Sequence, residues 1–570
     1  MPNRSNKLCA IALACFVAPG IFSATCAAQN ASTRSSTVAP ASYRVAGRIV
    51  SAVDGRPLQR ATVELLNPDA PLQNSSGEDA ASTTSDEDGR FTFTGVTAGL
   101  RNVQGSADGY LTSCYDAHEQ FCTGIVTGAG VDTESLLLKL TPEATLSGHV
   151  TDEAGDPVRN VNIRIYSKNL DQGYVRILPA NGFAQTNDLG EFVIGDLQSG
   201  RYYLSATVLP WYAVHPQPAQ PAPPASPGRQ DYAQVSVVDS LDPSLDVAYP
   251  TIFYPQATDS SGAEAIPVRA AERRNIELRL IPVPAVTVTL PKAPDDRNAG
   301  QVRLDQKVFG QFEPIRFASP SESTITGVSP GEYRLQQFGT SPGVASRSVQ
   351  ISLTAGNSSV SANSGQDLGN VKVQLKASDG GNLPAYLQLA LTATDGSSIQ
   401  SSQVNEKGEA EIDGLDPGAY SLTVSQNGQS YFVGKAISDG KPVSAYDLPV
   451  KAGASLSLTA LVAPISGSLK GIAQKDGKPA TGVLILLLPI DLSLRTLFTS
   501  RDESNLDGSF ELREIPPGKY ILLAIEDGWD LEWAKEDALA HYLPLGVPVT
   551  IPESGSSSIK LPDPVIVQPR

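Results

Sequence analysis

One pattern recurs along the chain at a fixed spacing, and it constrains the fold more than any other feature. A glycine precedes a short run of alternating apolar residues, and a second glycine follows ten positions after the first. Four copies are complete, and their glycine pairs are Gly89 and Gly99, Gly190 and Gly200, Gly408 and Gly418, and Gly508 and Gly518. A fifth copy, at 321–331, lacks the first glycine but keeps Gly331. Such repetition predicts an array of similar small domains rather than one large enzyme.

The residues around this pattern predict β-structure. Each repeat opens with a period-two apolar run, such as 45–50, followed by a turn with Gly or Pro and a second run, such as 61–65. Runs of this kind joined by tight turns are typical of β-hairpins. The first glycine of the pattern suits a turn position with positive φ. A tyrosine stands two residues after the second glycine in four copies, and the first copy has Arg101 there; the tyrosines are Tyr202, Tyr333, Tyr420 and Tyr520.

Apolar residues at equivalent places of the repeats are predicted to form the cores. They share one register with respect to the glycines, so they point to the same side of each strand. The residues are Phe91, Phe192, Phe510, Val96, Leu197, Val328, Leu415 and Ile515. The fold class expected is therefore all-β, a tandem array of about five β-sandwiches.

The first 28 residues read as a signal peptide. Arg4 and Lys7 precede an apolar stretch at 8–22, and Ala28 fits the end of a cleavage site. Export is the expectation, to the periplasm or the exterior; an anchor through a lipid on Cys26 is the weaker alternative. The expected parts are the signal peptide at 1–28, a flexible tail at 29–42, and sandwiches at 43–141, 142–282, 283–356, 366–451 and 452–570.

Two segments depart from the repeats. A stretch at 210–228 has seven prolines and is expected to be an extended loop of the second sandwich. Apolar residues at helical spacing within 530–542 predict one short helix in the last sandwich.

Two cysteines, Cys114 and Cys122, remain after cleavage of the signal peptide. In an exported chain two cysteines this close are expected to form a disulfide. Closing so short a loop would stabilise the fold by roughly 2.5 kcal/mol.

A search for catalytic chemistry gives nothing specific. The four histidines lack the spacing of a zinc peptidase, and no G-x-S-x-G, P-loop or dinucleotide-binding glycine pattern occurs. The spacing from Glu503 through Asp507 to Glu514 resembles a calcium loop, but the residues after it alternate as a strand, which favours a β-turn. The chain is therefore predicted not to be an enzyme, with no metal and no cofactor.

Charge and aromatic residues indicate the class of partner. The chain carries 60 acidic and 43 basic residues, a net charge of −17, which argues against nucleic acid and anionic membranes as partners.

Trp211, Tyr212 and Tyr254 flank the Pro-rich loop and belong to an aromatic cluster in the second repeat. Exposed aromatic rings stack on sugars, so these three are candidate ligand-binding residues. The alternative is that the cluster covers the core of its own sandwich.

The pattern V-x-G-x-V, G-x-P-L-x-x-A-x-V, D-x-x-G-x-F and G-V-x-x-G resembles the carboxypeptidase regulatory-like domain, and the best copies lie at 43–140, 144–206 and 465–525. The resemblance implies a transthyretin-like β-sandwich, grouped with carbohydrate-binding-like and collagen-adhesin folds. The segments 248–255 and 524–529 are similar to those of exported multi-repeat proteins of soil acidobacteria.

The function expected is interaction or scaffolding at the cell envelope, with carbohydrate as a candidate ligand and polysaccharides or envelope proteins as partners. Two alternatives stay open. One is an accessory or regulatory module of an extracellular peptidase or polysaccharide-degrading system, and the other is a component of an envelope receptor.

Overall fold

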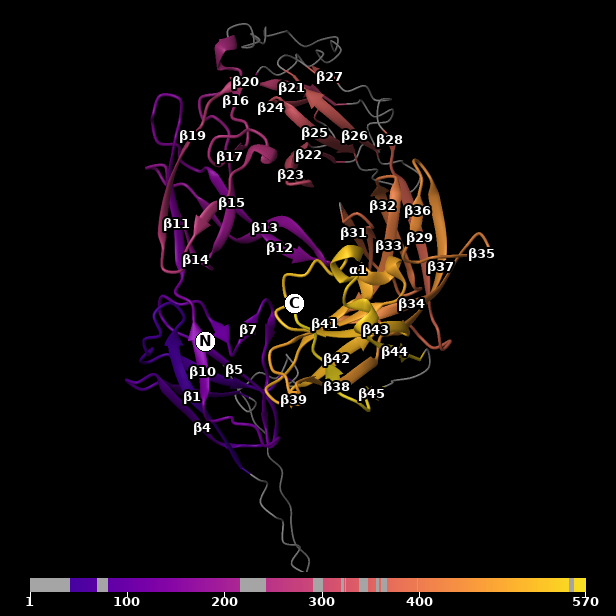
Figure 1. Cartoon of the computed structure of the whole chain (residues 1–570). Helices are drawn as coiled ribbons and strands as arrows, with labels where there is room; N and C mark the ends of the chain where they lie inside the picture. The colour runs from indigo at the N-terminus through magenta and orange to yellow at the C-terminus, as the bar shows by residue number, and fades with distance from the viewer. Residues whose placement is uncertain are drawn as a thin grey trace, which may run out of the picture. The chain divides into compact units, whose positions relative to one another are not determined.

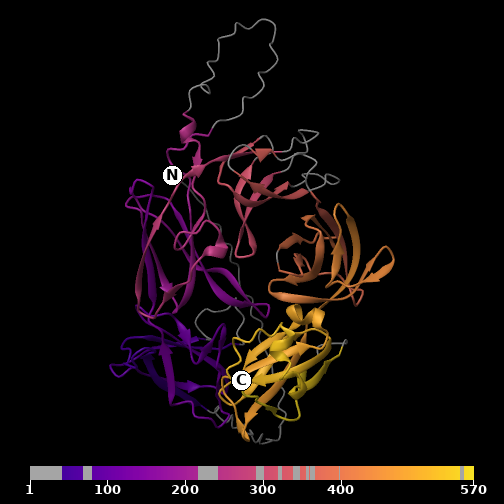
Figure 2. The ribbon, with the colours of Figure 1, turned by 45° about the horizontal axis from the view of Figure 1, so that its top comes forward.

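The computed structural model describes residues 42–68, 80–215, 242–290, 301–318, 322, 324–337, 347–354, 358–359, 366–396, 398–552 and 558–570. The predicted signal peptide, the tail up to residue 41 and the Pro-rich loop from residue 216 lie outside these ranges. The described chain forms successive β-sandwiches (Figures 1 and 2), which confirms the predicted fold class. Within the described ranges, no helix is both long enough and apolar enough to cross a membrane.

Each sandwich has a hydrophobic core of its own. The five cores are drawn from 45–140, 144–280, 286–353, 371–462 and 469–567. All eight apolar residues predicted from the shared register are buried in these cores. The periodicity therefore assigned the inward face of each motif strand correctly.

One strand arrangement recurs in all five sandwiches. The opening strand β1 (Tyr43–Ser51) pairs antiparallel with the motif strand β4 (Arg90–Val96) and parallel with the last strand β10 (Leu136–Leu140). The equivalent trios are β11 (Ala144–Thr151), β14 (Glu191–Leu197) and β19 (Arg273–Arg279); β21 (Val286–Thr289), β24 (Thr324–Val328) and β27 (Ser358–Ser359); β29 (Gly369–Ala377), β32 (Glu409–Leu415) and β37 (Ser455–Pro464); and β38 (Gly467–Lys475), β42 (Ser509–Ile515) and β45 (Ser558–Lys560).

The remaining strands cover the other side of each core. In the first sandwich they are β2 (Thr62–Leu66), β3 (Ala80–Thr84), β5 (Gly99–Ser106), β6 (Ser113–Cys114) and β9 (Ile125–Thr127). In the second they are β12 (Asn162–Asp171), β13 (Tyr174–Gln185), β15 (Gly200–Thr207), β17 (Ile252–Phe253) and β18 (Ile266–Val268). In the third they are β22 (Val302–Val308), β23 (Gln311–Ala318), β25 (Gly331–Gln337), β26 (Arg347–Leu353) and β28 (Gln366–Asp367).

In the fourth sandwich the corresponding strands and the opening trio form one nine-stranded sheet, whereas in the fifth they form a separate sheet. The fourth has β30 (Gln388–Ala393), β31 (Ile399–Gln403), β33 (Gly418–Gln426), β34 (Gln429–Ser438), β35 (Lys441–Val443) and β36 (Leu448–Val450). The fifth has β40 (Leu484–Pro489), β41 (Ser500–Glu503), β43 (Gly518–Ile525) and β44 (Val547–Ile551). Short pairs complete the set: β7 (Ala117–His118) with β8 (Phe121–Cys122), β16 (Val247–Ala248) with β20 (Val283–Pro284), and β39 (Lys478–Pro479) and β46 (Val565–Ile566) on β38.

The third and fourth sandwiches both extend past their expected ends, the third because β27 pairs with β21. Strand β37 pairs along its length with β29, and its apolar residues Leu458, Ala460 and Val462 lie in the fourth core. The fourth sandwich therefore extends through Pro464, and the boundary expected at residue 452 comes too early. The short spacing between the last strand of one repeat and the first strand of the next obscured this in the sequence.

The turns explain the glycines of the pattern. The first glycines have φ between 72° and 80°, and a side chain at Gly89 would meet the carbonyl oxygen of Ile49 at 2.5 Å. A second position with positive φ stands just before the last buried residue of each motif strand, where the register with the opening strand shifts by one residue in a β-bulge. The residues there are Gly95, Asp196, Gly327, Gly414 and Glu514.

The recurring tyrosine stabilises the turn at the second glycine of the pattern. Its hydroxyl donates a hydrogen bond to the carbonyl oxygen four residues earlier, as from Tyr202 to Gln198 at 2.9 Å and from Tyr520 to Pro516 at 2.7 Å. In the first sandwich Arg101 takes this place, and its guanidinium donates to Thr97 Oγ1, also four residues earlier, at 2.7 Å. Arg101 therefore stabilises, in the first sandwich, the turn that the tyrosine stabilises in the other four.

Within the described residues, α-helix occurs only as two single turns in the fifth sandwich. Helix α2 (Glu536–Leu539) lies within the segment predicted to be helical, but it is shorter than expected. Helix α1 (Arg495–Phe498) has no sequence signal of its own, and it follows directly on a 3₁₀ turn at Leu492–Leu494.

Candidate functional site

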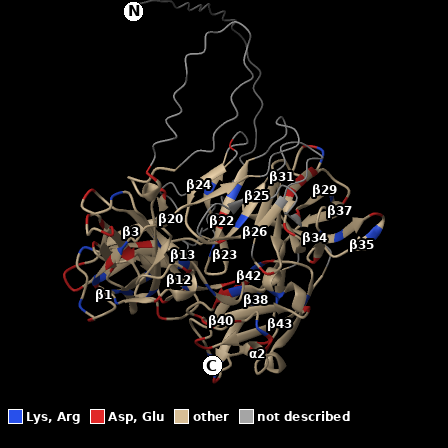
Figure 3. Cartoon of the chain, turned by 90° about the horizontal axis from the view of Figure 1, so that it is seen from above, with Lys and Arg blue, Asp and Glu red and all other residues tan. Residues whose placement is uncertain are grey.

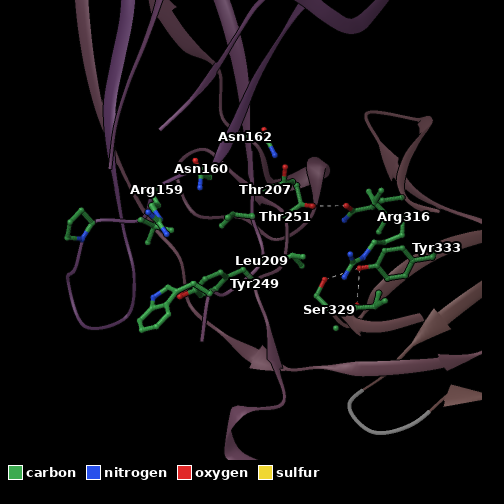
Figure 4. Close-up of a pocket in the computed structure, with 18 of the residues that line it drawn as sticks. Arg159, Asn160, Asn162, Thr207, Leu209, Tyr249, Thr251, Arg316, Ser329 and Tyr333 are labelled. Atoms are coloured by element: carbon green, nitrogen blue, oxygen red, sulfur yellow. Dashed lines mark hydrogen bonds between the residues drawn. The ribbon is translucent and has the colours of Figure 1, made fainter. Parts of the chain in front are cut away.

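A cleft of about 840 Å³ lies between the second and third sandwiches (Figure 4). Its lining is mixed, with amide, hydroxyl and guanidinium groups next to exposed apolar carbon. The polar lining residues from the second sandwich are Arg159, Asn160, Asn162, Asp188, Thr207 and Thr251, and those from the third are Gln306, Arg316, Ser329 and Tyr333. Trp211 and Tyr249 add aromatic rings, and Leu209 and Ile315 add aliphatic surface.

A turn before β12 forms one wall of the cleft. Thr186 holds this turn, because its hydroxyl accepts a hydrogen bond from the Val161 amide at 2.9 Å and donates to the Val158 carbonyl at 2.6 Å. The turn backbone is thereby fixed from inside the sandwich. The side chains of Arg159 and Asn160 are left exposed toward the cleft.

The same turn recurs in the first and fifth sandwiches, where Ser85 and Ser504 replace Thr186. The residues equivalent to Arg159 are Gln59 and Thr481. The fold therefore sets no requirement for an arginine at this position.

The opposite wall comes from β23 and from the turn before β25. Tyr333 donates a hydrogen bond to the Ser329 carbonyl at 2.9 Å, and its hydroxyl lies 2.9 Å from Ser329 Oγ. Arg316 reaches the Thr326 carbonyl at 3.4 Å, a long hydrogen bond that leaves much of its donor capacity unused. These contacts hold the turn in place while polar groups stay at the cleft surface.

An aromatic cluster fixes the junction that carries the cleft. Phe309, at the tip of the β22–β23 hairpin, packs against Tyr166, Tyr203 and Phe253, with ring centroids 5.0, 5.3 and 5.7 Å away. Burial, and then the charge of Glu313, raises the pKa of the Tyr166 hydroxyl to about 12. Because rings from both sandwiches interlock here, the two walls are held at a defined spacing.

Of the three predicted ligand-binding aromatics, only Trp211 lines the cleft. Its side chain is 85% exposed, and its ring lies edge-on to Tyr212 with centroids 5.8 Å apart. Tyr212 instead donates a hydrogen bond to Glu153 at 2.7 Å, and Tyr254 is half-buried against the core. Tyr249, which was not among the three, lines the cleft and bonds Glu153 at 3.1 Å.

The remaining aromatic residues of the cluster pack within the protein rather than in the cleft. Tyr202 serves its turn, and Tyr203 and Phe253 pack in the junction. Burial raises the pKa of the Tyr249 hydroxyl at the cleft wall.

The first sandwich carries a second notable region. Cys114 and Cys122 are bonded, with Cα atoms 5.8 Å apart, which confirms the predicted disulfide. The bond closes a loop that contains β7 and β8, and this loop, 114–123, reaches the fifth sandwich. We call it the disulfide loop.

The disulfide loop surrounds a buried carboxylate of the fifth sandwich. Glu503 is 1% exposed and accepts a hydrogen bond from Thr123, while His118 Nδ1 lies 3.3 Å from its second oxygen. The His118 ring stacks on Trp529 with centroids 4.9 Å apart. The Leu506 amide donates to the Gly124 carbonyl at 2.9 Å, so the backbones are also joined.

These contacts account for the calcium-like spacing around Glu503. Its carboxylate faces Thr123 and His118, and the loop after it is a turn between β41 and β42. In the part of the chain that the structure describes, no three His, Cys, Asp or Glu residues are grouped so that they could hold a metal ion.

Comparisons with known proteins place the sequence similarity at the N-terminal sandwich. Residues 44–120 match the family model of the carboxypeptidase regulatory-like domain. No curated protein is significantly similar in sequence to this chain.

The solved structures to which this chain is similar include a Bacillus anthracis TIE protein, at 10% identity, 75% coverage of this chain, 76% of that chain and a TM-score of 0.17. The minor pilin GBS52 of Streptococcus agalactiae has 12% identity, 44% and 99% coverage, and a TM-score of 0.20. A streptococcal ancillary pilin has 10% identity, 56% and 98% coverage, and a TM-score of 0.17. The match to the carboxypeptidase regulatory-like domain at residues 44–120 thus falls within the first of five sandwiches that share one strand arrangement.

Proposed function

We propose that this chain is an exported, non-catalytic β-sandwich protein that binds carbohydrate in the cleft between its second and third sandwiches. The single observation that carries the proposal is Trp211, whose indole is 85% exposed beside a cleft lined with amides and hydroxyls. An aromatic face that stays in water is suited to stacking on the C–H face of a sugar ring. The predicted signal peptide supports a role outside the cytoplasm.

The polar groups of the cleft suit a hydroxyl-rich ligand. Asn160 and Asn162 present side-chain amides, each of which can donate and accept hydrogen bonds. Thr207 adds a hydroxyl on the same wall. Sugars offer both donors and acceptors around an apolar face, so a mixed lining matches them better than it matches a purely apolar ligand.

Binding by one aromatic ring and a few hydrogen bonds would be weak. Millimolar affinity, about −4 kcal/mol, is the expected scale for a single cleft. Pull-down on a panel of immobilised plant and cell-wall polysaccharides is the appropriate test. Trp211→Ala should lose retention on the polysaccharide that holds the native protein.

Phe183→Ala is the matched control. Phe183 is an 82% exposed aromatic residue of the same sandwich, and it does not line the cleft. This variant should be retained like the native protein. Equal retention of Trp211→Ala and native protein, or no retention of the native protein on any polysaccharide, would contradict the proposal and favour a scaffold.

A further inference from the structure

Two arginines give the cleft a charge that differs from the charge of the whole chain. Arg159 and Arg316 lie on opposite sides of the cleft (Figure 4), whereas Asp188 is the one acidic residue among its lining residues. The chain as a whole carries 60 acidic against 43 basic residues. Acidic and basic residues are interspersed over the described sandwiches (Figure 3), so a cleft with two arginines and one acid is a local departure.

Neither arginine is occupied by a strong partner within the described residues. Arg159 comes within 4.0 Å of Asp188, but both side chains are more than two-thirds exposed, and such a pair contributes little. Arg316 is half-buried and has only the 3.4 Å hydrogen bond to Thr326. Both guanidinium groups therefore keep free donors for a ligand.

The structure of the turn also does not depend on the side chain of Arg159. The equivalent positions of the same turn hold Gln59 in the first sandwich and Thr481 in the fifth, and the turn hydrogen bonds are the same in all three. A charged residue that the turn does not require, aimed into a cleft, is better explained by what the cleft binds.

We propose that the cleft binds an acidic polysaccharide whose sugar rings carry carboxylates, that is, a uronic-acid polymer. The inference rests on the proposed carbohydrate binding and adds the substrate class. Trp211 stacks on one sugar ring, and Arg159 and Arg316 bind the carboxylates of that ring and its neighbours. A guanidinium presents two parallel N–H donors that match the two oxygens of a carboxylate.

The test compares one polymer with and without its charge. The native protein is passed over resin-bound polygalacturonate and over the same resin after full methyl esterification, at equal ionic strength. The backbone and hydroxyls are the same, so only the carboxylates differ. Two exposed charge contacts of about threefold each predict roughly tenfold stronger retention on the free acid.

The test and control variants all replace arginine by glutamine, so each substitution removes one positive charge. Arg159→Gln with Arg316→Gln should lower retention on polygalacturonate to the level of the ester, and high salt should do the same to the native protein. Arg201→Gln is the control, since Arg201 is an exposed arginine of the same sandwich outside the cleft lining. A melting curve of each variant verifies that the fold is retained.

The outcomes separate the two proposals. Equal, Trp211-dependent retention on the acid and the ester would overturn the uronate assignment and leave carbohydrate binding in place. Loss of retention in Arg201→Gln equal to that of the double variant would also overturn the assignment. No retention on either resin would overturn the uronate assignment, and a panel without any retaining polysaccharide would overturn carbohydrate binding as well.

Discussion

The junction between the second and third sandwiches leaves an open cleft, whereas the contact between the first and fifth sandwiches is filled by side chains. In the cleft, Trp211 and Arg159 stay exposed and Arg316 keeps free donors. In the contact, Glu503 is buried and both of its oxygens have partners on the disulfide loop. Similar sandwiches can therefore meet in ways that serve stability or in ways that leave room for a ligand. Substitutions in the two regions should separate these roles.

The largest loss of stability is expected from Glu503→Ala. The change removes the buried acceptor of Thr123 and the partner of His118, and it leaves a cavity at the contact. Breaking a buried ion pair costs about 3 kcal/mol. The Leu506 amide, bonded to the Gly124 carbonyl, reports the opening of this contact, and its hydrogen exchange should become about 100-fold faster.

The cleft provides the control for this prediction. Polysaccharide retention by Glu503→Ala should equal that of the native protein, because the cleft lining is untouched. Unchanged exchange at Leu506 would show that Glu503 does not hold the contact together.

Removing the disulfide should have the next largest effect. Cys114→Ser with Cys122→Ser frees a loop of nine residues and should cost about 2.5 kcal/mol, since the unfolded loop gains conformational freedom. The loss should be concentrated in the disulfide loop and the Leu506 amide. Thermal unfolding together with site-resolved exchange measures both; a loss spread evenly over all five sandwiches would contradict a local role.

A smaller effect is expected from pH. The hydrogen bond to Glu503 raises the pKa of His118, with help from the charges of Asp116 and Asp527, and burial raises the pKa of Asp502 to about 6. Both groups bind protons more tightly in the folded state. Their contribution to stability is present at low pH and is lost as pH rises, through pH 4 to 6 for Asp502 and above pH 6.5 for His118.

Leu506 exchange measured between pH 5 and 8, after correction for the intrinsic rate, should therefore show the contact opening more readily as pH rises. His118→Gln should remove the part of this dependence above pH 6.5, and Asp502→Asn should remove the pH dependence of global unfolding below pH 6. A contact that tightens as pH rises would contradict the sign.

The smallest change in stability is expected from Trp211→Ala. An exposed side chain contributes little to the fold, so the free energy of unfolding should change by less than about 0.5 kcal/mol. Polysaccharide retention should nevertheless be lost. A drop in melting temperature comparable with that of Glu503→Ala would mean that Trp211 packs within the fold, and the contrast between the two regions would disappear.

Much of the fold follows from the sequence because glycine spacing and apolar alternation are local signals. They identified the motif strands, the buried faces and the positive φ of Gly89 and its equivalents. The bulge near the end of each motif strand was not predicted, and at Asp196 and Glu514 no glycine marks its positive φ. The helix near the C-terminus was overextended, since periodicity alone does not fix its length.

The candidate site could be predicted only in part. Trp211 was identified because it lies outside the repeat, next to the Pro-rich loop. Arg159 could have been found by aligning its turn with Gln59 and Thr481, whereas Arg316 lies on β23, outside the pattern that the repeats share. The contact of Thr123 with Glu503 joins residues 380 positions apart, which no repeat pattern encodes.

Tryptophan fluorescence gives the most direct test of the cleft. The chain has three tryptophans; Trp533 is buried and Trp529 stacks on His118, so Trp211 is the one exposed beside the cleft. Titration with a soluble oligogalacturonide should give a saturable shift in emission at millimolar concentration, both in the native protein and in Phe183→Ala. Trp211→Phe should abolish the shift. Absence of a shift in the native protein, or its persistence in Trp211→Phe, would contradict binding at this cleft.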